Sequence, residues 1–205
     1  MRIVRQNEPH IVAEAAEVLR EGGIVLMPTD TWYALCADAL SNAAVERVYA
    51  IKGRDKSKAM HALVKDINDA RRFGTISMKG ETLLAQYPGL ISLVVPQKPG
   101  IKKSGILRDI DTFGFRVPTY QLCLDIIDAF GGPITATSAN ISGMDVSQNL
   151  GAIVAQLGPA NNYIDSAIDG GALSSSKPST VVFCDEGHIR LLREGAVPFD
   201  AIDGG

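Results

Sequence analysis

Apolar positions along the chain form two alternating kinds of segment. Short continuous apolar runs, bounded by glycine, proline or polar residues, predict β-strands that are buried on both faces. Stretches in which apolar residues recur every three to four positions predict amphipathic helices. The predicted strands are 2–5, 24–28, 60–64, 90–96, 113–118, the first half of 133–143, 179–184 and 188–193. The predicted helices are 10–23, 41–52, 67–73, 80–88, 120–132 and 148–158.

The order of these segments indicates an α/β fold. Strands that alternate with helices favour a central sheet flanked by helices. Several late strands have no helix between them, which favours a twisted sheet with mixed parallel and antiparallel pairing. No stretch is long or polar enough to act as a linker, so residues 1–205 are predicted to form one domain.

Composition narrows the classes of protein that the chain can represent. Apolar residues make up 46% of the 205 positions, which is enough for a full core, and the formal net charge is −3. A net acidic chain has no global basic field for nucleic acid or membranes, so an anionic ligand would have to be met by local cations. Three widely spaced cysteines, the lack of a secretory signal and the lack of a membrane-spanning run predict a cytoplasmic protein with reduced thiols and no membrane contact.

The stretch "MPTDTWYAL" (27–35) brings polar side chains to the end of a buried strand. Thr29, Asp30 and Thr31 follow that strand directly, and open α/β sheets bind ligands where their strands end. The alternative interpretation is turn chemistry, because Pro-Thr-Asp-Thr is well suited to a turn. From this stretch alone, the turn is favoured.

The stretch "KGRDKSK" (52–58) concentrates positive charge just after a predicted helix. Lys52, Arg54, Lys56 and Lys58 fall within seven residues, a cluster that suits a polyanion such as a nucleotide triphosphate. The alternative is a solvated helix C-terminus, where cations complement the helix dipole. The chain contains no GxxxxGK[ST] sequence, so a P-loop is not indicated.

The stretch "PITATSANISG" (133–143) runs from a strand into small polar residues. Ser138 and Asn140 lie two positions apart and share a face if the strand continues through them. They could bind phosphate or ribose oxygens, or they could cap a following helix. A nucleophilic serine is not indicated, because the glycines of a nucleophile elbow are missing.

Two arginines end apolar strands near the middle and the C-terminus. Arg116 and Arg193 each need an anionic partner, which is either a ligand or an internal carboxylate. Ser179 and Thr180 begin a nearby strand. These weak signals together predict a crevice that binds and aligns anionic substrates, with catalysis by positioning and charge stabilisation.

The order of these motifs resembles the YrdC/TsaC family of threonylcarbamoyl-adenylate synthases. "GGIVLMPTDTWYAL", "KGR", "FRVP", "TSANISG", "STVV" and "LLREGA" carry the resemblance, which spans Gly22 to Ala196. It implies a twisted α/β sheet around a large, positively lined cavity. It also implies a nucleotidyltransferase that joins L-threonine, bicarbonate and ATP into threonylcarbamoyl-AMP and pyrophosphate, with Mg²⁺ carried by the phosphates. A partner transferase then moves the threonylcarbamoyl group to adenosine 37 of tRNA.

The resemblance also implies roles for individual residues, with Lys52 and Arg54 as the catalytic pair. The residues that it assigns to ATP are Lys52, Arg54, Lys58, Thr112, Ser138, Asn140 and Arg193. The residues that it assigns to threonine are Thr31, His61, Arg116 and Ser179. No protein ligand for a metal is implied.

The chain departs from the family pattern at several of these positions. Asp55 stands where many members have proline, and the family's usual histidine position is occupied by Leu63. His61 lies two residues earlier on the same predicted strand face and could take over that position. Ser147 could likewise replace the Pro-Ser pattern that commonly follows Asn140.

Two alternatives to the synthase follow from these departures. One is a paralogue of the YciO type, with a nucleotide- or RNA-related role and no synthase activity. The other is an RNA-binding module, against which the net charge and the lack of an aromatic stacking pattern both argue. A local patch could still touch tRNA through Lys52, Arg54, Lys56, Lys58, Lys102 and Lys103.

Overall fold

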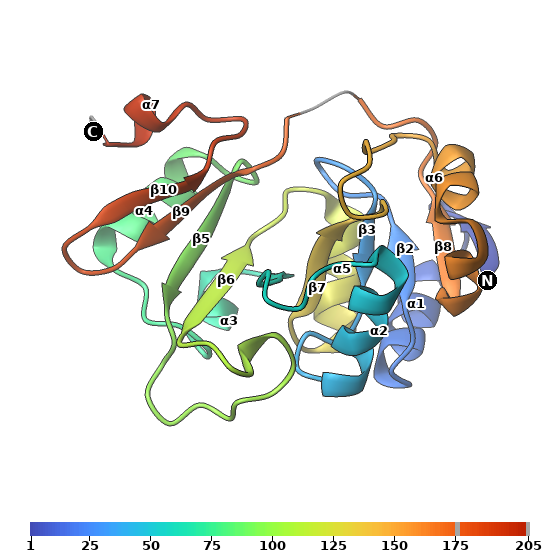
Figure 1. Cartoon of the computed structure of the whole chain (residues 1–205), viewed down its shortest axis with the longest axis horizontal. Coiled ribbons are helices and arrows are strands. Elements are labelled where there is room, and N and C mark those ends of the chain that lie inside the picture. Colours follow the sequence, from blue (N-terminus) through green and yellow to red (C-terminus); the bar gives the residue numbers. More distant parts are fainter. Residues whose placement is uncertain (175–176, 204–205) are drawn as a thin grey trace.

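The fold is built on a single ten-stranded mixed sheet. The computed structural model describes residues 1–174 and 177–203, with the two termini at opposite ends of the molecule (Figure 1). The strand order is β1-β8-β2-β3-β7-β4-β6-β5-β9-β10, with both parallel and antiparallel neighbours. The strands are β1 (Arg2–Arg5), β2 (Val25–Met27), β3 (Ala34–Cys36), β4 (His61–Leu63), β5 (Ile91–Pro96), β6 (Thr112–Arg116), β7 (Ile134–Ser138), β8 (Ser166–Asp169), β9 (Thr180–Cys184) and β10 (Ile189–Arg193).

Helices flank the sheet, as the alternation of segments predicts. They are α1 (Ile11–Arg20), α2 (Asn42–Lys52), α3 (Ile67–Ala70), α4 (Met78–Gln86), α5 (Gln121–Phe130), α6 (Leu150–Leu157) and α7 (Phe199–Asp203), with 3₁₀ turns at Gly105–Leu107 and Gly158–Tyr163. Helix α2 begins with a side-chain cap, because the Ser41 side chain accepts a hydrogen bond from the Ala44 N–H. None of the helices in the described part of the chain has the length and apolar character needed to cross a membrane.

Two hydrophobic clusters divide the core between the two faces of the sheet. On one face, α2, α4 and α6 pack over most of the sheet. On the other face, α1 and α5 pack against residues of β1, β2, β3, β4, β7 and β8. In the described part of the chain, this second face is therefore left without a helix over β5, β9 and β10, and that asymmetry leaves room for a cavity.

The structure corrects the sequence-based prediction in two places. Strands β3 and β8 were not predicted. Strand β3 (ALC) lies within the stretch 27–35, which was interpreted as a single turn motif, and β8 (SAID) has polar residues at both ends, so neither shows as a bounded apolar run. The strand that begins at Ile134 ends at Ser138, so Asn140 lies in the following bend and not on the strand face.

The three cysteines match the prediction of reduced core thiols. Cys36, Cys123 and Cys184 are buried and unpaired. Burial raises the pKa of Cys36 to about 12, which keeps this sulfur protonated and unreactive at neutral pH.

Candidate active site

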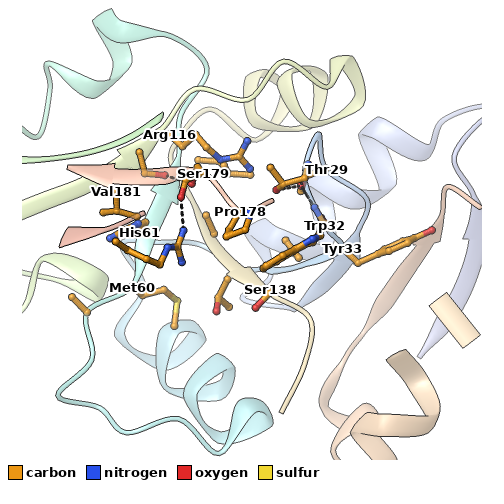
Figure 2. Close-up of a pocket in the computed structure, with 18 of the residues that line it drawn as sticks. Thr29, Trp32, Tyr33, Met60, His61, Arg116, Ser138, Pro178, Ser179 and Val181 are labelled. Atoms are coloured by element: carbon orange, nitrogen blue, oxygen red, sulfur yellow. Dashed lines mark hydrogen bonds between the residues drawn. The ribbon is translucent and has the colours of Figure 1, made fainter. Parts of the chain in front are cut away.

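A cavity of about 300 Å³ opens on the sheet face that carries α1 and α5, and its lining extends from β3, β4 and β7 to β5, β9 and β10 (Figure 2). Its floor comes largely from alternate residues of neighbouring strands, such as His61 and Leu63 of β4 and Ala136 and Ser138 of β7. Strand β7 is antiparallel to β4, so these residues do not lie at a common carboxyl edge. The predicted crevice at strand ends is therefore corrected to a cavity on a sheet face, completed by the turn after β2 and the ends of β6 and β10.

The cavity brings together seven of the eleven residues predicted for the site. These are Thr31, Arg54, His61, Arg116, Ser138, Ser179 and Arg193. They come from segments that are up to 162 positions apart, from Thr31 to Arg193. The predicted assembly of distant motifs at one concave site is thus what the fold produces.

The turn after β2 combines both interpretations of the "PTDT" sequence. The Thr29 hydroxyl donates to the Trp32 carbonyl (2.6 Å) and accepts from the N–H groups of Thr31 (3.1 Å) and Trp32 (3.2 Å). These bonds close a tight turn that presents Thr31 and Trp32 to the cavity. The turn is therefore the means by which the polar side chains reach the site.

Arg116 is held in place by the buried carboxylate of Asp30. Its guanidinium forms an ion pair with Asp30 and donates to the Gly89 carbonyl (3.3 Å), and the two ion-paired side chains are 7% and 11% exposed. Asp30 also accepts from the backbone N–H (3.0 Å) and hydroxyl (3.2 Å) of Thr119. The internal salt bridge that was an open alternative for Arg116 is present, and it holds the guanidinium against the cavity wall.

Arg54 and Arg193 line the same cavity without a carboxylate partner among the described residues. Arg54 donates to the Ala59 carbonyl (2.9 Å) and Arg193 to the Ser179 carbonyl (2.8 Å). The pKa of Arg193 is lowered by partial burial and then by repulsion from Arg54 and Arg116. This mutual repulsion shows that three guanidinium groups face one space, and a bound anion would relieve it.

His61 stands among these arginines as a neutral ring. Burial, and then the charges of Arg193, Arg54 and Arg116, lower the pKa of its imidazole to about 4. The ring lies directly over Gly114 of β6, where a Cβ would sit 2.4 Å from the His61 Cδ2. A glycine at position 114 is therefore what allows the His61 ring to approach β6 this closely.

We expect Gly114→Ala to destabilise the protein by about 1–3 kcal/mol, because the new methyl group must displace the His61 ring. The free energy of unfolding, measured by urea denaturation, checks this. A double variant with His61→Ala is the control, because removing the ring leaves space for the methyl group. Strictly additive effects of the two substitutions would contradict this packing.

The Ser138–Asn140 segment is tied to the end of α2 by Lys52. The Lys52 ammonium donates to the Ser138 carbonyl, to the Asn140 carbonyl (2.9 Å) and to Asn140 Oδ1 (2.9 Å). Asn140 Oδ1 also accepts from the Ser138 hydroxyl (2.7 Å), and its amide nitrogen donates to the Met144 carbonyl (2.6 Å). Ser138 therefore faces the cavity, whereas Lys52 and Asn140 are buried behind it.

Four predicted site residues lie outside the lining of this cavity. Lys52 and Asn140 are 2% and 7% exposed, so the structure places them in the network behind Ser138, and not in the cavity lining where direct contacts with ATP were predicted. Lys58 is an exposed residue next to Arg54. Thr112 is the first residue of β6, two residues before Gly114, and Arg116 is two residues after it. The His61 ring, which lies against Gly114, therefore separates Thr112 from Arg116 along this strand.

The predicted basic patch is weaker than its sequence suggests. Lys56 pairs with Glu46, and Lys103 pairs with Asp111 at 2.9 Å, while Lys52 is buried. These internal pairs reduce the charge that the patch offers to a polyanion.

Sequence reasoning missed several residues of the cavity wall. Ser92 lies 2.8 Å from Ser179, oxygen to oxygen, and Tyr33 donates to the Gly171 carbonyl (2.8 Å) from the far side of the wall. Ser92 sits inside the apolar run 90–96, and a lone serine within such a run was the one available signal. Tyr33 belongs to the "TWYAL" segment, in which the pattern alone does not separate wall from core.

Sequence comparison finds a family model and relatives that match most of this chain. The Sua5, YciO and YrdC family model, described as telomere recombination, matches residues 17–195. Threonylcarbamoyl-AMP synthase of Bacillus subtilis is 32% identical over 199 residues, which cover 96% of this chain and 56% of that protein. A putative threonylcarbamoyl-AMP synthase of Methanocaldococcus jannaschii is 31% identical, covering 88% of this chain and 84% of that protein.

Solved structures agree with the fold. Sua5 of Pyrococcus abyssi, in a complex with L-threonine, has a TM-score of 0.87 at 29% identity, covering 99% of this chain and 59% of that one. YciO of E. coli has a TM-score of 0.83 at 22% identity and supports the fold alone. The chain thus spans little more than half the length of the Bacillus and Pyrococcus relatives.

Proposed function

Because the chain belongs to the Sua5, YciO and YrdC family, we propose that it is an L-threonylcarbamoyladenylate synthase. It would join L-threonine, bicarbonate and ATP into threonylcarbamoyl-AMP, with release of pyrophosphate and water. Relatives that carry this name are 31–32% identical over most of the chain. The matching Pyrococcus structure was solved with L-threonine, which supports the amino-acid substrate.

The structural observation that best supports the proposal is the convergence of three arginines on one cavity. Arg54, Arg116 and Arg193 converge on a cavity whose described lining contains no carboxylate. Like charges held together in this way favour a polyanionic ligand, and hydroxyl groups beside them can orient a small polar substrate. A nucleotide triphosphate and an amino acid together meet both requirements.

We assign the residues to the two substrates as the family resemblance implies. Arg116, fixed by Asp30, would pair with the threonine carboxylate, while Thr31, His61 and Ser179 would contact the rest of the amino acid. Arg54 and Arg193 would bind the phosphates. Ser138, whose hydroxyl hydrogen is donated to Asn140, would accept a hydrogen bond from a ribose hydroxyl, with Lys52 and Asn140 supporting it from behind. Lys58 and Thr112 are proposed only for outlying parts of the nucleotide.

The proposed reaction requires the protein to align the two substrates and does not require a protein nucleophile. A threonine carbamate formed from bicarbonate would attack the α-phosphorus of ATP, and the bond to the leaving pyrophosphate would break. The arginines would offset the charge that builds up on the phosphate oxygens. The described lining has no carboxylate to hold Mg²⁺, so in this proposal the metal arrives on the ATP phosphates and no step depends on protein ligands.

The proposed product defines the partners. Threonylcarbamoyl-AMP is a mixed anhydride that must be consumed by a transferase acting on adenosine 37 of tRNA. We propose a cytoplasmic location, where the three free cysteines would remain reduced. Direct contact with tRNA stays a prediction, weakened by the ion pairs in the basic patch.

The proposal is tested by following pyrophosphate from purified protein with ATP, Mg²⁺, bicarbonate and L-threonine. Release that depends on both threonine and bicarbonate is the expected result, and a reaction that lacks either one is the control. Bound ATP without any release would instead indicate a paralogue of the YciO type. Double-stranded RNA binding that persists when Arg54 and Ser138 are changed to alanine would favour the RNA-binding alternative.

A further inference from the structure

Lys52 is a buried cation with an unusual set of partners. It is the last residue of α2, it is 2% exposed, and its ammonium donates to three oxygen atoms. All three belong to Ser138 and Asn140, which are 86 and 88 positions away in the sequence. A buried lysine usually pairs with a carboxylate, and here the partners are two backbone carbonyls and one amide oxygen.

The main chain of Lys52 reinforces this link. Its carbonyl accepts a hydrogen bond from the Ser142 N–H (2.9 Å), so side chain and backbone together hold the bend that follows β7. Asn140 Oδ1 accepts from both the ammonium and the Ser138 hydroxyl, and this sets the orientation of the Ser138 side chain. Ser138 is the member of this network that reaches the cavity.

No neighbouring charge compensates the ammonium. The groups that bond it from β7 and the following bend, Ser138 and Asn140, are uncharged, and on its own segment Arg54 adds repulsion. Burial and then Arg54 lower the pKa of Lys52 to about 7. The free protein therefore holds this lysine between its charged and neutral forms at neutral pH.

We propose that Lys52 is a positioning residue that holds Ser138 beside the nucleotide site, and that bound nucleotide phosphates stabilise the charged form of this lysine. The inference rests on the proposed function, because it needs a polyphosphate in the cavity. A bound polyanion would favour the protonated ammonium, and that ammonium has one hydrogen for each of its three acceptors. Binding of the nucleotide would thereby also fix the Ser138–Asn140 bend.

The expected direction of the pH effect follows from this linkage. Above pH 7 the free protein has lost the Lys52 proton, and binding must recover it, so nucleotide affinity should fall as the pH rises. Between pH 7.5 and 8.5 the fall should approach about tenfold, because one proton is taken up per site. The nucleotide phosphates are already ionised in this range and do not contribute to the slope.

Calorimetry with ATP and Mg²⁺, without threonine or bicarbonate, tests the inference. At pH 8 in two buffers of different ionisation enthalpy, the protein should take up close to about one proton per ATP. Lys52→Met should take up none and should lose the pH slope. Lys65→Met is the matched control, because Lys65 is an exposed lysine paired with Asp128 outside the cavity, and its uptake should equal that of the unchanged protein.

The outcomes separate this inference from the proposed function. ATP binding by the unchanged protein without proton uptake would overturn the linkage even if Lys52→Met failed to fold. Failure of the unchanged protein to bind ATP would overturn the proposed function instead. Hydrogen exchange of the 136–145 segment without ligand tests the positioning role alone: faster exchange in Lys52→Met supports it, and unchanged exchange contradicts it.

Discussion

Replacing Arg116 by methionine is expected to lower the free energy of unfolding by about 3–5 kcal/mol and to remove the synthase activity. The reason lies in Asp30, which would stay buried with only the two Thr119 donors for its charge. For a domain of this size, the loss corresponds to a fall in melting temperature of roughly 6–20 °C. Chemical denaturation and the pyrophosphate assay measure the two effects separately.

The double variant Arg116→Met with Asp30→Asn separates structure from substrate binding. Removing both charges leaves no uncompensated ion, so most of the lost stability should return. Activity should not return, because the guanidinium that faces the cavity is still missing. A double variant that recovered activity together with stability would show that Arg116 has only a structural role.

The sequence predicted the fold class well because periodicity reports on burial over a whole segment. The helix over 41–52 with its Ser41 cap and the strand over 90–96 both appear in the structure. Strand β3 was missed because it directly follows the Thr29–Trp32 turn, within a stretch that was interpreted as turn chemistry as a whole. Pairing on both sides, with β2 and with β7, makes this short segment a strand, and that pairing is not a local property.

The sequence predicted which residues line the site better than it predicted how those residues are arranged. Residue type indicated that Arg54, Arg116 and Arg193 need anions, and all three line the cavity. Residue type could not show that Asp30 supplies one of those anions from 86 positions away. The difference arises because pairing between distant charges is decided by the tertiary fold.

The spacing of Ser138 and Asn140 illustrates the limit of a local rule. Two positions apart on a strand would place both side chains on one face. The strand ends at Ser138, and the bend turns Asn140 inward toward Lys52. The buried ammonium that organises this bend lies on another element, so the local sequence could not reveal it.

The cavity is built from charges that oppose one another in the free protein. Arg193 repels Arg54 and Arg116, and of these three arginines only Arg116 has a carboxylate partner, Asp30, among the described residues. Such a site favours the bound state because the ligand supplies the missing anion. A cation of this kind contributes to binding without contributing to folding stability, which can be tested.

We expect Arg193→Met to weaken ATP binding roughly 10–150-fold, the loss of a charge-assisted contact worth about 1.5–3 kcal/mol. The free energy of unfolding without ligand should change by less than about 1 kcal/mol, because the loss of the hydrogen bond to the Ser179 carbonyl is offset by the removal of a repelled charge. Calorimetric titration with ATP and urea denaturation of the free protein give the two quantities. Together they distinguish a binding role from a packing role.

Arg190→Met provides the matched control on the same strand. Arg190 stacks over the Phe183 ring at 5.6 Å and does not belong to the described lining of the cavity. Its substitution should leave ATP binding unchanged, because only a charge that faces the cavity acts on the phosphates at short range. Equal losses of affinity in the two variants would mean that general surface charge, and not the convergence of three arginines, attracts the nucleotide.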